Sequence, residues 1–417
     1  MDFYNVLVYI LAYIGFVASS FYVINLFAYY KRRQSERESI EKKVTILIPA
    51  YNEEKSIEKT IKSALSLNYP KDKLEVIIID DGSKDKTYEL AKRFASNQNL
   101  VVKVLTKKNG GKGTALNLGI KNASGEIIVS MDADSFVSPD ALKKMVYYFK
   151  NEKVMAVTPS MGVYKPSGFL QRIQQIEYYM GVFLRKSFAT MNAIHITPGA
   201  FSAYRKSFFE KYGGYDEKNI TEDLEIALRI QSKNFIIENS PKSVVYTIAP
   251  KSFRSLLVQR RRWYTGLVKN LWSYKKLFGF KKGPLGYLVL PVAVSTILLS
   301  VILTSYVVIK TSIDIKDEII SLQAINFRFQ DSIDINKYII ETFFYRIFSS
   351  PTFLISIIFI FLLIFYMFFS RKQMQYTDNL KINFIMFIFF YSILFTIWWI
   401  FSFLYILFNK KVVWRKE

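Results

Sequence analysis

The sequence predicts an α/β domain with a mostly parallel sheet, joined to apolar helices near both ends of the chain. Between residues 44 and 160, short β-rich runs alternate with helical patterns. Uncharged apolar runs lie at 3–29 and again beyond residue 285, in a chain of 417 residues that is 51% hydrophobic. A bilayer crossing needs about 20 such residues, so these runs predict membrane helices.

The central region provides the evidence for the sheet. Near-continuous Val, Ile and Leu runs that alternate with helices predict parallel strands covered on both faces, and such sheets bind ligands beyond the carboxyl ends of their strands. The expected strands are 44–51, 74–81, 101–106, 126–134 and 154–160, and the expected helices are 56–67, 86–97, 113–123 and 140–151.

The apolar runs predict four membrane spans. The first, 3–29, is too long for a secretory signal and lacks a small-x-small cleavage site, so we expect a retained helix. The basic run KRRQSERES follows it and marks the cytoplasmic side, which places the N-terminus outside. The later runs are 285–309, 352–369 and 382–408.

The last apolar run leaves one question of topology open. Three later spans would put the C-terminus outside, whereas the basic tail NKKVVWRKE favours the cytoplasm, and the long final run could hide a re-entrant bend. The expected organisation is a membrane helix at 1–30, a cytoplasmic domain at 31–250, interfacial helices at 251–282 and a membrane region of about three spans at 283–417.

Composition excludes several chemistries. The chain has no cysteine, which rules out a disulfide, a thiolate nucleophile and a zinc-thiolate site. The formal charge of +23 would suit nucleic acid, but the basic residues cluster beside the membrane segments and are better explained by anionic headgroups. We therefore expect no nucleic-acid partner, and we assign no role to the single histidine, His195.

Polar residues stand at the ends of three expected strands. The first strand ends in PAYNE, the second in Asp80-Asp81-Gly82-Ser83 and the fourth in Asp132-Ala133-Asp134. A carboxylate such as Asp81 can accept hydrogen bonds from ribose hydroxyls or a base imide, although an Asp-Gly turn explains the same residues. Where a strand breaks into a turn, Asp132 and Asp134 can approach one hard cation, and Mg²⁺ or Mn²⁺ fits this donor set.

The glycine-rich stretch NGGKGTALN, residues 109–117, carries Lys112 and could cradle a phosphate at a helix start. It lacks the spacing of a P-loop. No G-x-G-x-x-G follows a strand, which argues against a dinucleotide-binding dehydrogenase.

The stretch ITEDLEIALRIQ, residues 220–231, opens a helix. Thr221 can cap it, and Glu222 and Asp223 suit the positive end of the helix dipole. The alternative is that Asp223 is a general base whose pKa is raised by nearby carboxylates. On this motif alone, capping is the simpler interpretation.

The stretch SFRSLLVQRRRWYTGLVKNLW, residues 252–272, carries three consecutive arginines and a tryptophan in its middle. Arg260 to Arg262 supply forked donors for phosphate, and Trp263 offers a flat face to a sugar ring. An amphipathic helix at the membrane surface would also explain the pattern, and both interpretations can hold together.

Taken in order, these motifs resemble the membrane-embedded family-2 glycosyltransferases with a GT-A fold, such as the poly-N-acetylglucosamine, hyaluronan and chitin-oligosaccharide synthases. The family signature D, D-x-D, T/E-E-D and Q-x-x-R-W is matched by Asp81, Asp132/Asp134, Thr221-Glu222-Asp223 and Gln259-x-x-Arg262-Trp263. The match covers residues 44 to about 270, and the layout is most similar to the poly-N-acetylglucosamine branch.

The resemblance assigns roles to individual residues. It implies that Tyr51, Glu53, Asp81, Lys112 and Asp132 bind the nucleotide; that Asp132 and Asp134 hold Mg²⁺ or Mn²⁺; that Asp223, with Glu222, is catalytic; and that Gln259, Arg262, Trp263 and Gly199 meet the diphosphate and acceptor. The helix expected at 169–188 would face the interface or the acceptor.

The chain also departs from the family pattern. Here R-W is followed by Tyr264 and Thr265 rather than by a small, glycine-rich run, which leaves the sugar open. We expect one span before the domain, whereas hyaluronan synthases have more, and we expect no cyclic-dinucleotide-binding domain after the membrane helices.

The resemblance implies a processive, inverting β-glycosyltransferase of the plasma membrane that polymerises a UDP-sugar, with UDP-GlcNAc preferred, and extrudes the polysaccharide. Its partners would be the donor, the growing chain, the bilayer and, as an open point, a small accessory subunit. The alternative is transfer of one sugar to a polyprenyl-phosphate carrier. A non-enzymatic channel or scaffold is a third hypothesis, which the coincidence of four motifs disfavours.

Overall fold

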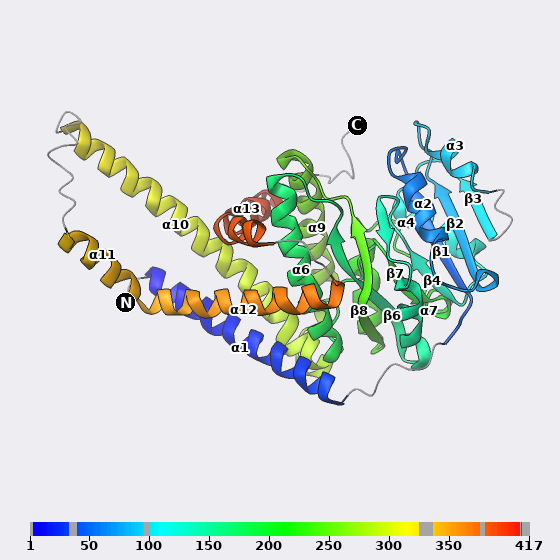
Figure 1. Ribbon diagram of the computed structural model, residues 1–417, viewed down its shortest axis with the longest axis horizontal. Helices are drawn as coiled ribbons and strands as arrows, with labels where there is room; N and C mark the ends of the chain where they lie inside the picture. The colour runs from blue at the N-terminus through cyan, green and yellow to red at the C-terminus, as the bar shows by residue number, and fades with distance from the viewer. Residues whose placement is uncertain are drawn as a thin grey trace.

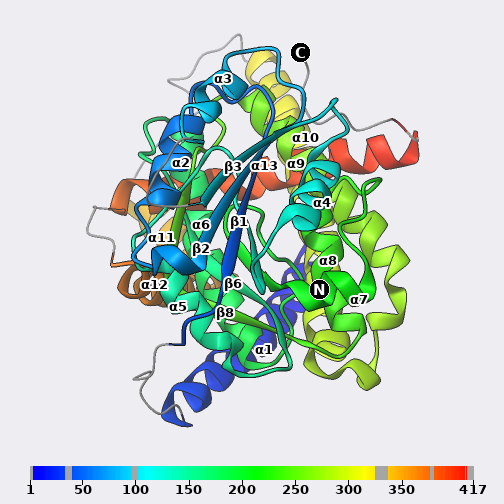
Figure 2. The ribbon, with the colours of Figure 1, turned by 90° about the vertical axis from the view of Figure 1, so that its right-hand side faces the viewer.

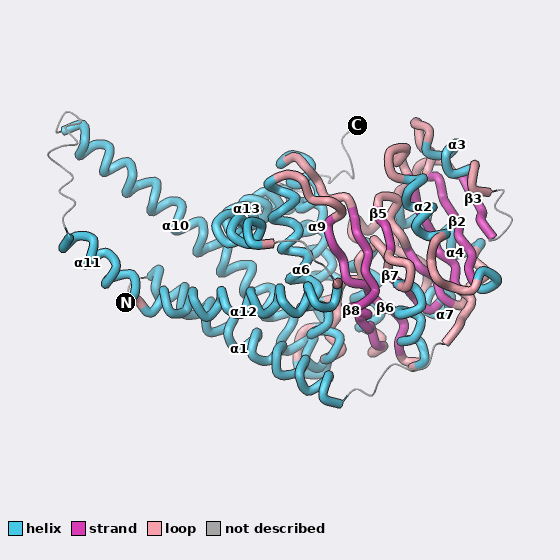
Figure 3. The backbone as a smooth tube through the Cα atoms, viewed as in Figure 1, coloured by secondary structure: helices cyan, strands magenta, loops and turns pink. Residues whose placement is uncertain are grey.

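The computed structural model describes residues 3–32, 40–95, 101–324, 337–375, 380–408 and 410. An α/β domain lies at one end of the molecule, and long helices extend from its other side (Figure 1). Figure 3 shows the same division, because the described strands all gather in the domain.

One eight-stranded sheet forms the centre of the domain, in the order β3-β2-β1-β4-β7-β6-β8-β5. The half from β3 to β4 is parallel throughout, whereas β7 runs antiparallel to both of its neighbours. The strands are β1 Val44–Ala50, β2 Leu74–Asp80, β3 Val101–Thr106, β4 Ile127–Ser130, β5 Ser135–Val137, β6 Val154–Val163, β7 Ser202–Arg205 and β8 Ile236–Thr247. The predicted mostly parallel sheet is confirmed.

Helices cover both faces of this sheet because the strands are apolar on both sides. Alternate residues of β1 contribute to two separate cores, Ile46 and Ile48 on one face and Leu47 on the other. The first core contains residues from α2 Ile57–Leu65, α3 Thr87–Lys92 and α5 Ala141–Val146. The second contains residues from α4 Lys112–Asn122, α7 Lys206–Tyr212 and α8 Glu222–Ser232. Figure 2 views the parallel strands from the end of the domain.

Some elements differ from the sequence prediction. The fourth strand is short and is followed by β5, and the fourth helix ends early in a 3₁₀ turn at Tyr147–Lys150. The sequence analysis missed β5, β7 and β8, since the first two have only three and four residues and β8 is interrupted by Asn239 and Pro241.

Two helices connect the domain to the apolar helices. They are α6 Phe169–Thr190 and α9 Phe253–Ser273, which cover the predicted helical stretches 169–188 and 252–272. Ser252 caps α9, because its hydroxyl accepts a hydrogen bond from the Ser255 amide at 3.2 Å. The hydroxyl of Ser370 donates to the Tyr179 carbonyl at 2.6 Å and thereby joins α6 to α12.

In the part of the chain that the structure describes, four helices are long and apolar enough to cross a membrane, as predicted. The long helices are α1 Phe3–Arg32, α10 Leu290–Ala324, α12 Pro351–Met374 and α13 Lys381–Leu407, with the shorter α11 Lys337–Phe348 before α12. α10 follows a π-helical turn at Leu285–Val289 and runs beyond the predicted end at residue 309. The last apolar run is one helix, α13, without the re-entrant bend that the sequence left open.

Candidate active site

The loops after β1 and β2 are joined by hydrogen bonds at the carboxyl edge of the parallel strands. The Asn52 amide donates to the Ser83 hydroxyl at 3.0 Å, and the Lys84 amide donates to the Asn52 side-chain oxygen at 2.9 Å. Tyr51 and Glu53 are half-buried in the first of these loops. The two predicted nucleotide-binding loops therefore form one continuous edge.

Asp81 is buried at the end of β2 and is held by three donors. Its carboxylate accepts hydrogen bonds from the amides of Gly110 and Gly111 at 3.1 and 2.8 Å, and it lies 2.6 Å from the Lys107 ammonium. The glycine-rich stretch thus turns its amides toward a carboxylate of the chain itself. Gly111 has a φ of +92°, which glycine adopts without strain, and α4 begins at the next residue.

Lys112 links the other acidic motifs at the first residue of α4. Its ammonium lies 2.7 Å from Asp132 and 3.0 Å from Glu222, and only 11% of its side chain is exposed. Burial alone would lower the pKa of Lys112, but Asp132, Glu222 and Asp223 raise it above its usual value. Lys112 is therefore a permanent cation between the strand-end motif and the start of α8.

Gly199 packs directly against this ion-pair network. A Cβ at this position would collide with the Lys112 ammonium and would lie 3.1 Å from an Asp132 oxygen. Glycine is needed here because the backbone approaches the charged groups so closely. The structure thus places Gly199 beside Lys112 and Asp132, which also pair with each other.

Asp134 lies two residues beyond Asp132, and its carboxylate lies near residues of β5 and β8. The hydroxyls of Thr247 and Ser135 lie 3.4 and 3.5 Å from its carboxylate. Among the described residues, no group of three or more His, Cys, Asp or Glu side chains is placed to hold a metal. Two carboxylates completed by phosphate oxygens remain a suitable donor set for Mg²⁺ or Mn²⁺, since these ions bind few protein ligands.

The N-terminus of α8 carries the predicted base. Burial and the adjacent Glu222 carboxylate raise the pKa of Asp223 to about 6, although Lys112 and Arg262 lower it. One carboxylate oxygen accepts a hydrogen bond from the Leu224 amide at 2.9 Å. A carboxylate with this pKa can accept a proton near neutral pH.

Thr221 occupies the N-cap position of α8, but its hydroxyl makes no capping hydrogen bond, which corrects the simple capping interpretation. Its hydroxyl instead accepts a hydrogen bond from the side-chain amide of Asn270 in α9 at 2.9 Å. Gly266 of α9 lies against the Thr221 side chain so closely that a Cβ would collide with it. These contacts bring the start of α8 onto α9.

The three consecutive arginines of α9, Arg260 to Arg262, have three different neighbours. Arg262 donates to the Ile220 carbonyl at 3.4 Å and acts electrostatically on Asp223. Arg261 lies 4.0 Å from the centre of the Tyr405 ring. Arg260 is paired with Glu177, so it does not supply the free phosphate donor that the sequence suggested. Of the three, Arg262 faces the acidic motifs.

Gln259 and Trp263 lie on the same helix as Arg262. Both are half-buried, and the Gln259 side-chain oxygen is a buried atom that has no hydrogen-bond partner among the described residues. The Trp263 ring lies 4.5 Å from the Arg260 guanidinium.

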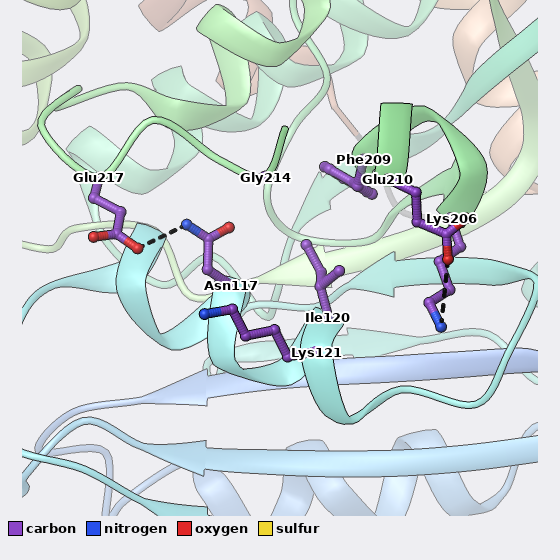
Figure 4. A pocket seen from close by; sticks show the side chains of 8 residues that line it. All are labelled: Asn117, Ile120, Lys121, Lys206, Phe209, Glu210, Gly214 and Glu217. Atoms are coloured by element: carbon purple, nitrogen blue, oxygen red, sulfur yellow. Dashed lines mark hydrogen bonds and ion pairs between the residues drawn. The ribbon is translucent and has the colours of Figure 1, made fainter. Parts of the chain in front are cut away.

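The cavity in Figure 4 lies elsewhere, between α4, α7 and the loop after α7. It has a volume of about 430 Å³, and the hydrogen bond between Asn117 and Glu217 at 2.9 Å lies in its wall. None of the predicted site residues lines it.

Two contributors to the site were missed by the sequence analysis. Lys107 and Glu177 hold Asp81 and Arg260, respectively. Lys107 lies just before the glycine-rich stretch, and this proximity could have indicated it. Glu177 has no such signal, since it is one polar residue in an amphipathic helix.

Comparisons with known proteins show the family of the chain. The model of the family described as glycosyl transferase family 2 matches residues 45–213. A poly-beta-1,6-N-acetyl-D-glucosamine synthase of Staphylococcus aureus (strain COL) is 32% identical over 292 residues, which cover 66% of this chain and 69% of the relative. A synthase of the same name from Staphylococcus epidermidis is 34% identical over 246 residues, covering 58% of this chain but only 59% of the relative.

The solved structures show the fold. A mannosyltransferase of Pyrobaculum calidifontis, in complex with GDP-mannose and Mn²⁺, is similar with a TM-score of 0.54 at 23% identity, over 73% of this chain and 92% of that one. The class is therefore a glycosyltransferase with a GT-A-like domain and long apolar helices. The chain belongs to glycosyl transferase family 2.

Proposed function

We propose that this protein is a processive, inverting β-glycosyltransferase that polymerises UDP-GlcNAc into a polysaccharide and extrudes it across the plasma membrane. The observation that carries the proposal is Asp223, a carboxylate with a pKa of about 6, next to the Lys112 network and Arg262. The names of the two staphylococcal relatives support the polymer and its sugar.

In this proposal the carboxyl edge of β1 and β2 binds the donor. Tyr51, Glu53 and Asp81 hold the uracil and ribose, and Lys112 lies toward the diphosphate. The buried Asp81 supports this role because its carboxylate is fixed by the Gly110 and Gly111 amides. A preorganised carboxylate can select a base edge or a ribose hydroxyl without reorganising.

Asp132 and Asp134 would hold Mg²⁺ or Mn²⁺ against the donor diphosphate. When bound, the ion would neutralise negative charge on the leaving nucleotide. The similar mannosyltransferase structure contains Mn²⁺, which supports a divalent ion in general. Lys112 beside Asp132 adds a fixed positive charge to the same place.

Asp223 would take the proton from the acceptor hydroxyl, and this hydroxyl would attack the sugar carbon opposite the leaving diphosphate. The bond from that carbon to the diphosphate oxygen breaks as the new glycosidic bond forms, which inverts the configuration. Glu222 keeps the pKa of Asp223 high enough for this task. Arg262 stabilises charge on the diphosphate, while Gln259, Trp263 and Gly199 contact the acceptor sugar.

The apolar helices would provide the route for the product. α6 contacts α12 and α13, and α9 contacts α13, so the proposed acceptor side adjoins helices that are long enough to cross a bilayer (Figure 1). The basic residues at the end of α1 support a cytoplasmic domain. A small accessory membrane subunit stays an open part of the proposal.

The test is nucleotide release by the purified protein in detergent. The protein is incubated with Mg²⁺ or Mn²⁺ and a panel of UDP- and GDP-sugars, and the released nucleoside diphosphate is measured. Including GDP-sugars matters because the similar solved structure holds GDP-mannose. We expect release from UDP-GlcNAc above all other donors. Release from a GDP-sugar alone would contradict the proposed donor.

A matched pair of variants makes this test specific. Asp223→Asn should abolish release while UDP binding persists. Asp72→Asn, which removes an exposed carboxylate in a 3₁₀ turn, should have no effect. Equal release by the Asp223→Asn variant would remove Asp223 as the base.

A further inference from the structure

Arg260 is the most deeply buried arginine of α9, with 2% of the residue exposed. Its guanidinium forms a two-pronged pair with Glu177 of α6, with distances of 2.8 and 2.6 Å to the two carboxylate oxygens. The roles proposed above for α9 do not include either residue.

The Arg260 guanidinium also lies close to two indole rings. It is 4.5 Å from the centre of the Trp263 ring and 5.1 Å from that of Trp398, a residue of α13 that is completely buried. A guanidinium within about 6 Å of an aromatic face is attracted to it, more strongly where water is excluded. Arg260 thus contacts the ring to which the proposed function assigns the acceptor sugar.

Glu177 extends the same cluster to a third helix. The Tyr391 hydroxyl of α13 donates to a Glu177 oxygen at 3.2 Å, and this oxygen also accepts from Arg260. One carboxylate of α6 therefore holds groups from α9 and α13 together.

The energetics favour a role in geometry over one in stability. Burying an ion pair costs desolvation energy that the attraction often only balances, and apolar replacements are often as stable. A two-pronged guanidinium–carboxylate pair, in contrast, fixes both position and plane. The Arg260 plane determines where the Trp263 ring can lie.

We propose that Glu177 and Arg260 are positioning residues that fix the Trp263 indole as the surface for the acceptor sugar and that, through Tyr391 and Trp398, couple this surface to helix α13. The inference rests on the proposed acceptor role of Trp263. Each of the two residues acts through Trp263 and touches no reacting atom.

The experiment measures binding of a short N-acetylglucosamine oligosaccharide to the full-length protein in detergent, with UDP and Mg²⁺ present, and UDP binding separately. Arg260→Lys keeps the positive charge but loses the planar, two-pronged pair with Glu177 that holds the guanidinium beside Trp263, so the oligosaccharide Kd should rise about tenfold. The UDP Kd should stay within about twofold, because Asp81 is held by other groups.

Glu177→Gln should weaken binding of the oligosaccharide in the same way. As a matched control, Arg229→Lys changes another arginine that is paired with a buried glutamate, Glu225, at 2.7 Å. It should lower the melting temperature without changing the oligosaccharide Kd.

A charge swap separates positioning from stability. Glu177→Arg combined with Arg260→Glu restores an ion pair but places no guanidinium plane against Trp263 from α9. The swap should recover part of the melting temperature while the oligosaccharide Kd stays high. Recovery of both the melting temperature and the oligosaccharide Kd would overturn the proposal. An unchanged oligosaccharide Kd in Arg260→Lys would also overturn it. If the swap variant does not fold, the Arg260→Lys measurement alone decides.

The outcomes also separate this inference from the proposed function. A wild-type protein that releases UDP but binds no oligosaccharide would overturn the inference and leave the transferase intact. A protein that binds the oligosaccharide in an Arg260-dependent way but releases no UDP would support the inference and contradict the proposed reaction.

Discussion

Asp81, on the proposed donor side of the site, and Arg260, on the proposed acceptor side, are both buried charged groups, but they are held by different parts of the chain. Asp81 is fixed by the Gly110 and Gly111 amides, which lie within 30 residues of it in the same parallel half-sheet. Arg260 depends on Glu177, 83 residues away, and on the membrane-region residue Trp398. The groups that hold the proposed donor side therefore come from the α/β domain, whereas those that hold the proposed acceptor side include an apolar helix.

The largest effect should come from Asp223→Asn, where the two sides meet. Removing a general base costs about 10²–10⁴-fold in rate, so we expect transfer to fall about 10³-fold in a kinetic assay of UDP release. UDP binding measured by calorimetry should be nearly unchanged. Loss of UDP binding in this variant would place Asp223 on the donor side and would contradict the proposed division into a donor side and an acceptor side.

Asp223→Asn should also be more stable to thermal unfolding than the wild type at pH 7.5. The folded protein holds the pKa of Asp223 at about 6, above its ordinary value of 3.8, so ionisation of this group on raising the pH destabilises the fold. Asn removes that cost. The melting temperature of Asp223→Asn should exceed that of wild type at pH 7.5, and the difference should fade toward pH 4. A lower melting temperature at pH 7.5 would mean that the side chain is structural.

Arg262→Lys should reduce kcat about 100-fold, because an ammonium cannot replace a forked donor where charge develops on a diphosphate. The Km for the donor should change less than kcat. Arg261→Lys is the neighbouring control, since Arg261 stacks on Tyr405 and does not face the acidic motifs. Equal losses in both variants would indicate a general effect on α9.

Gly199→Ala should lower the transfer rate about tenfold, because the added Cβ would force the Lys112 ammonium from its place between Asp132 and Glu222. The protein should still fold, since a flexible lysine end can move. Steady-state kinetics on the folded variant give the test, and a rate equal to wild type would show that the Lys112 network is not needed for transfer.

The smallest effect is a pH dependence that should appear on the acceptor side alone. A base with a pKa of about 6 is half-protonated at that pH, so kcat should fall about twofold between pH 7.5 and 6 and about fivefold more between pH 6 and 5. UDP binding should not follow this profile. A kcat that stays constant down to pH 5 would exclude Asp223 as the titrating base.

The difference between the two sides also explains what the sequence could predict. Asp81, Asp132 and Asp134 directly follow or interrupt apolar strands, and the carboxyl ends of parallel strands meet at one edge. Their position at that edge therefore followed from local pattern alone. The same reasoning failed for β7 and β8, because a four-residue strand and a strand interrupted by Pro241 carry no clear period.

The acceptor side shows the limit of local pattern more clearly. Three consecutive arginines have similar sequence context, yet packing sends Arg260 to Glu177, Arg261 to Tyr405 and Arg262 toward Asp223. Successive helix positions differ by about 100°, so each arginine meets a different neighbour. Which neighbours these are depends on α6 and α13, which are distant in the chain.

The product of the purified protein with UDP-GlcNAc, Mg²⁺ and a trace of N-acetylglucosamine oligosaccharide provides the decisive measurement. Product mass is compared with the amount of UDP released at low conversion. A processive polymerase predicts a few high-mass chains while most of the oligosaccharide stays unextended. Chains extended by single sugars, or one organic-soluble product, would contradict the proposed polysaccharide synthase and favour transfer to a lipid carrier.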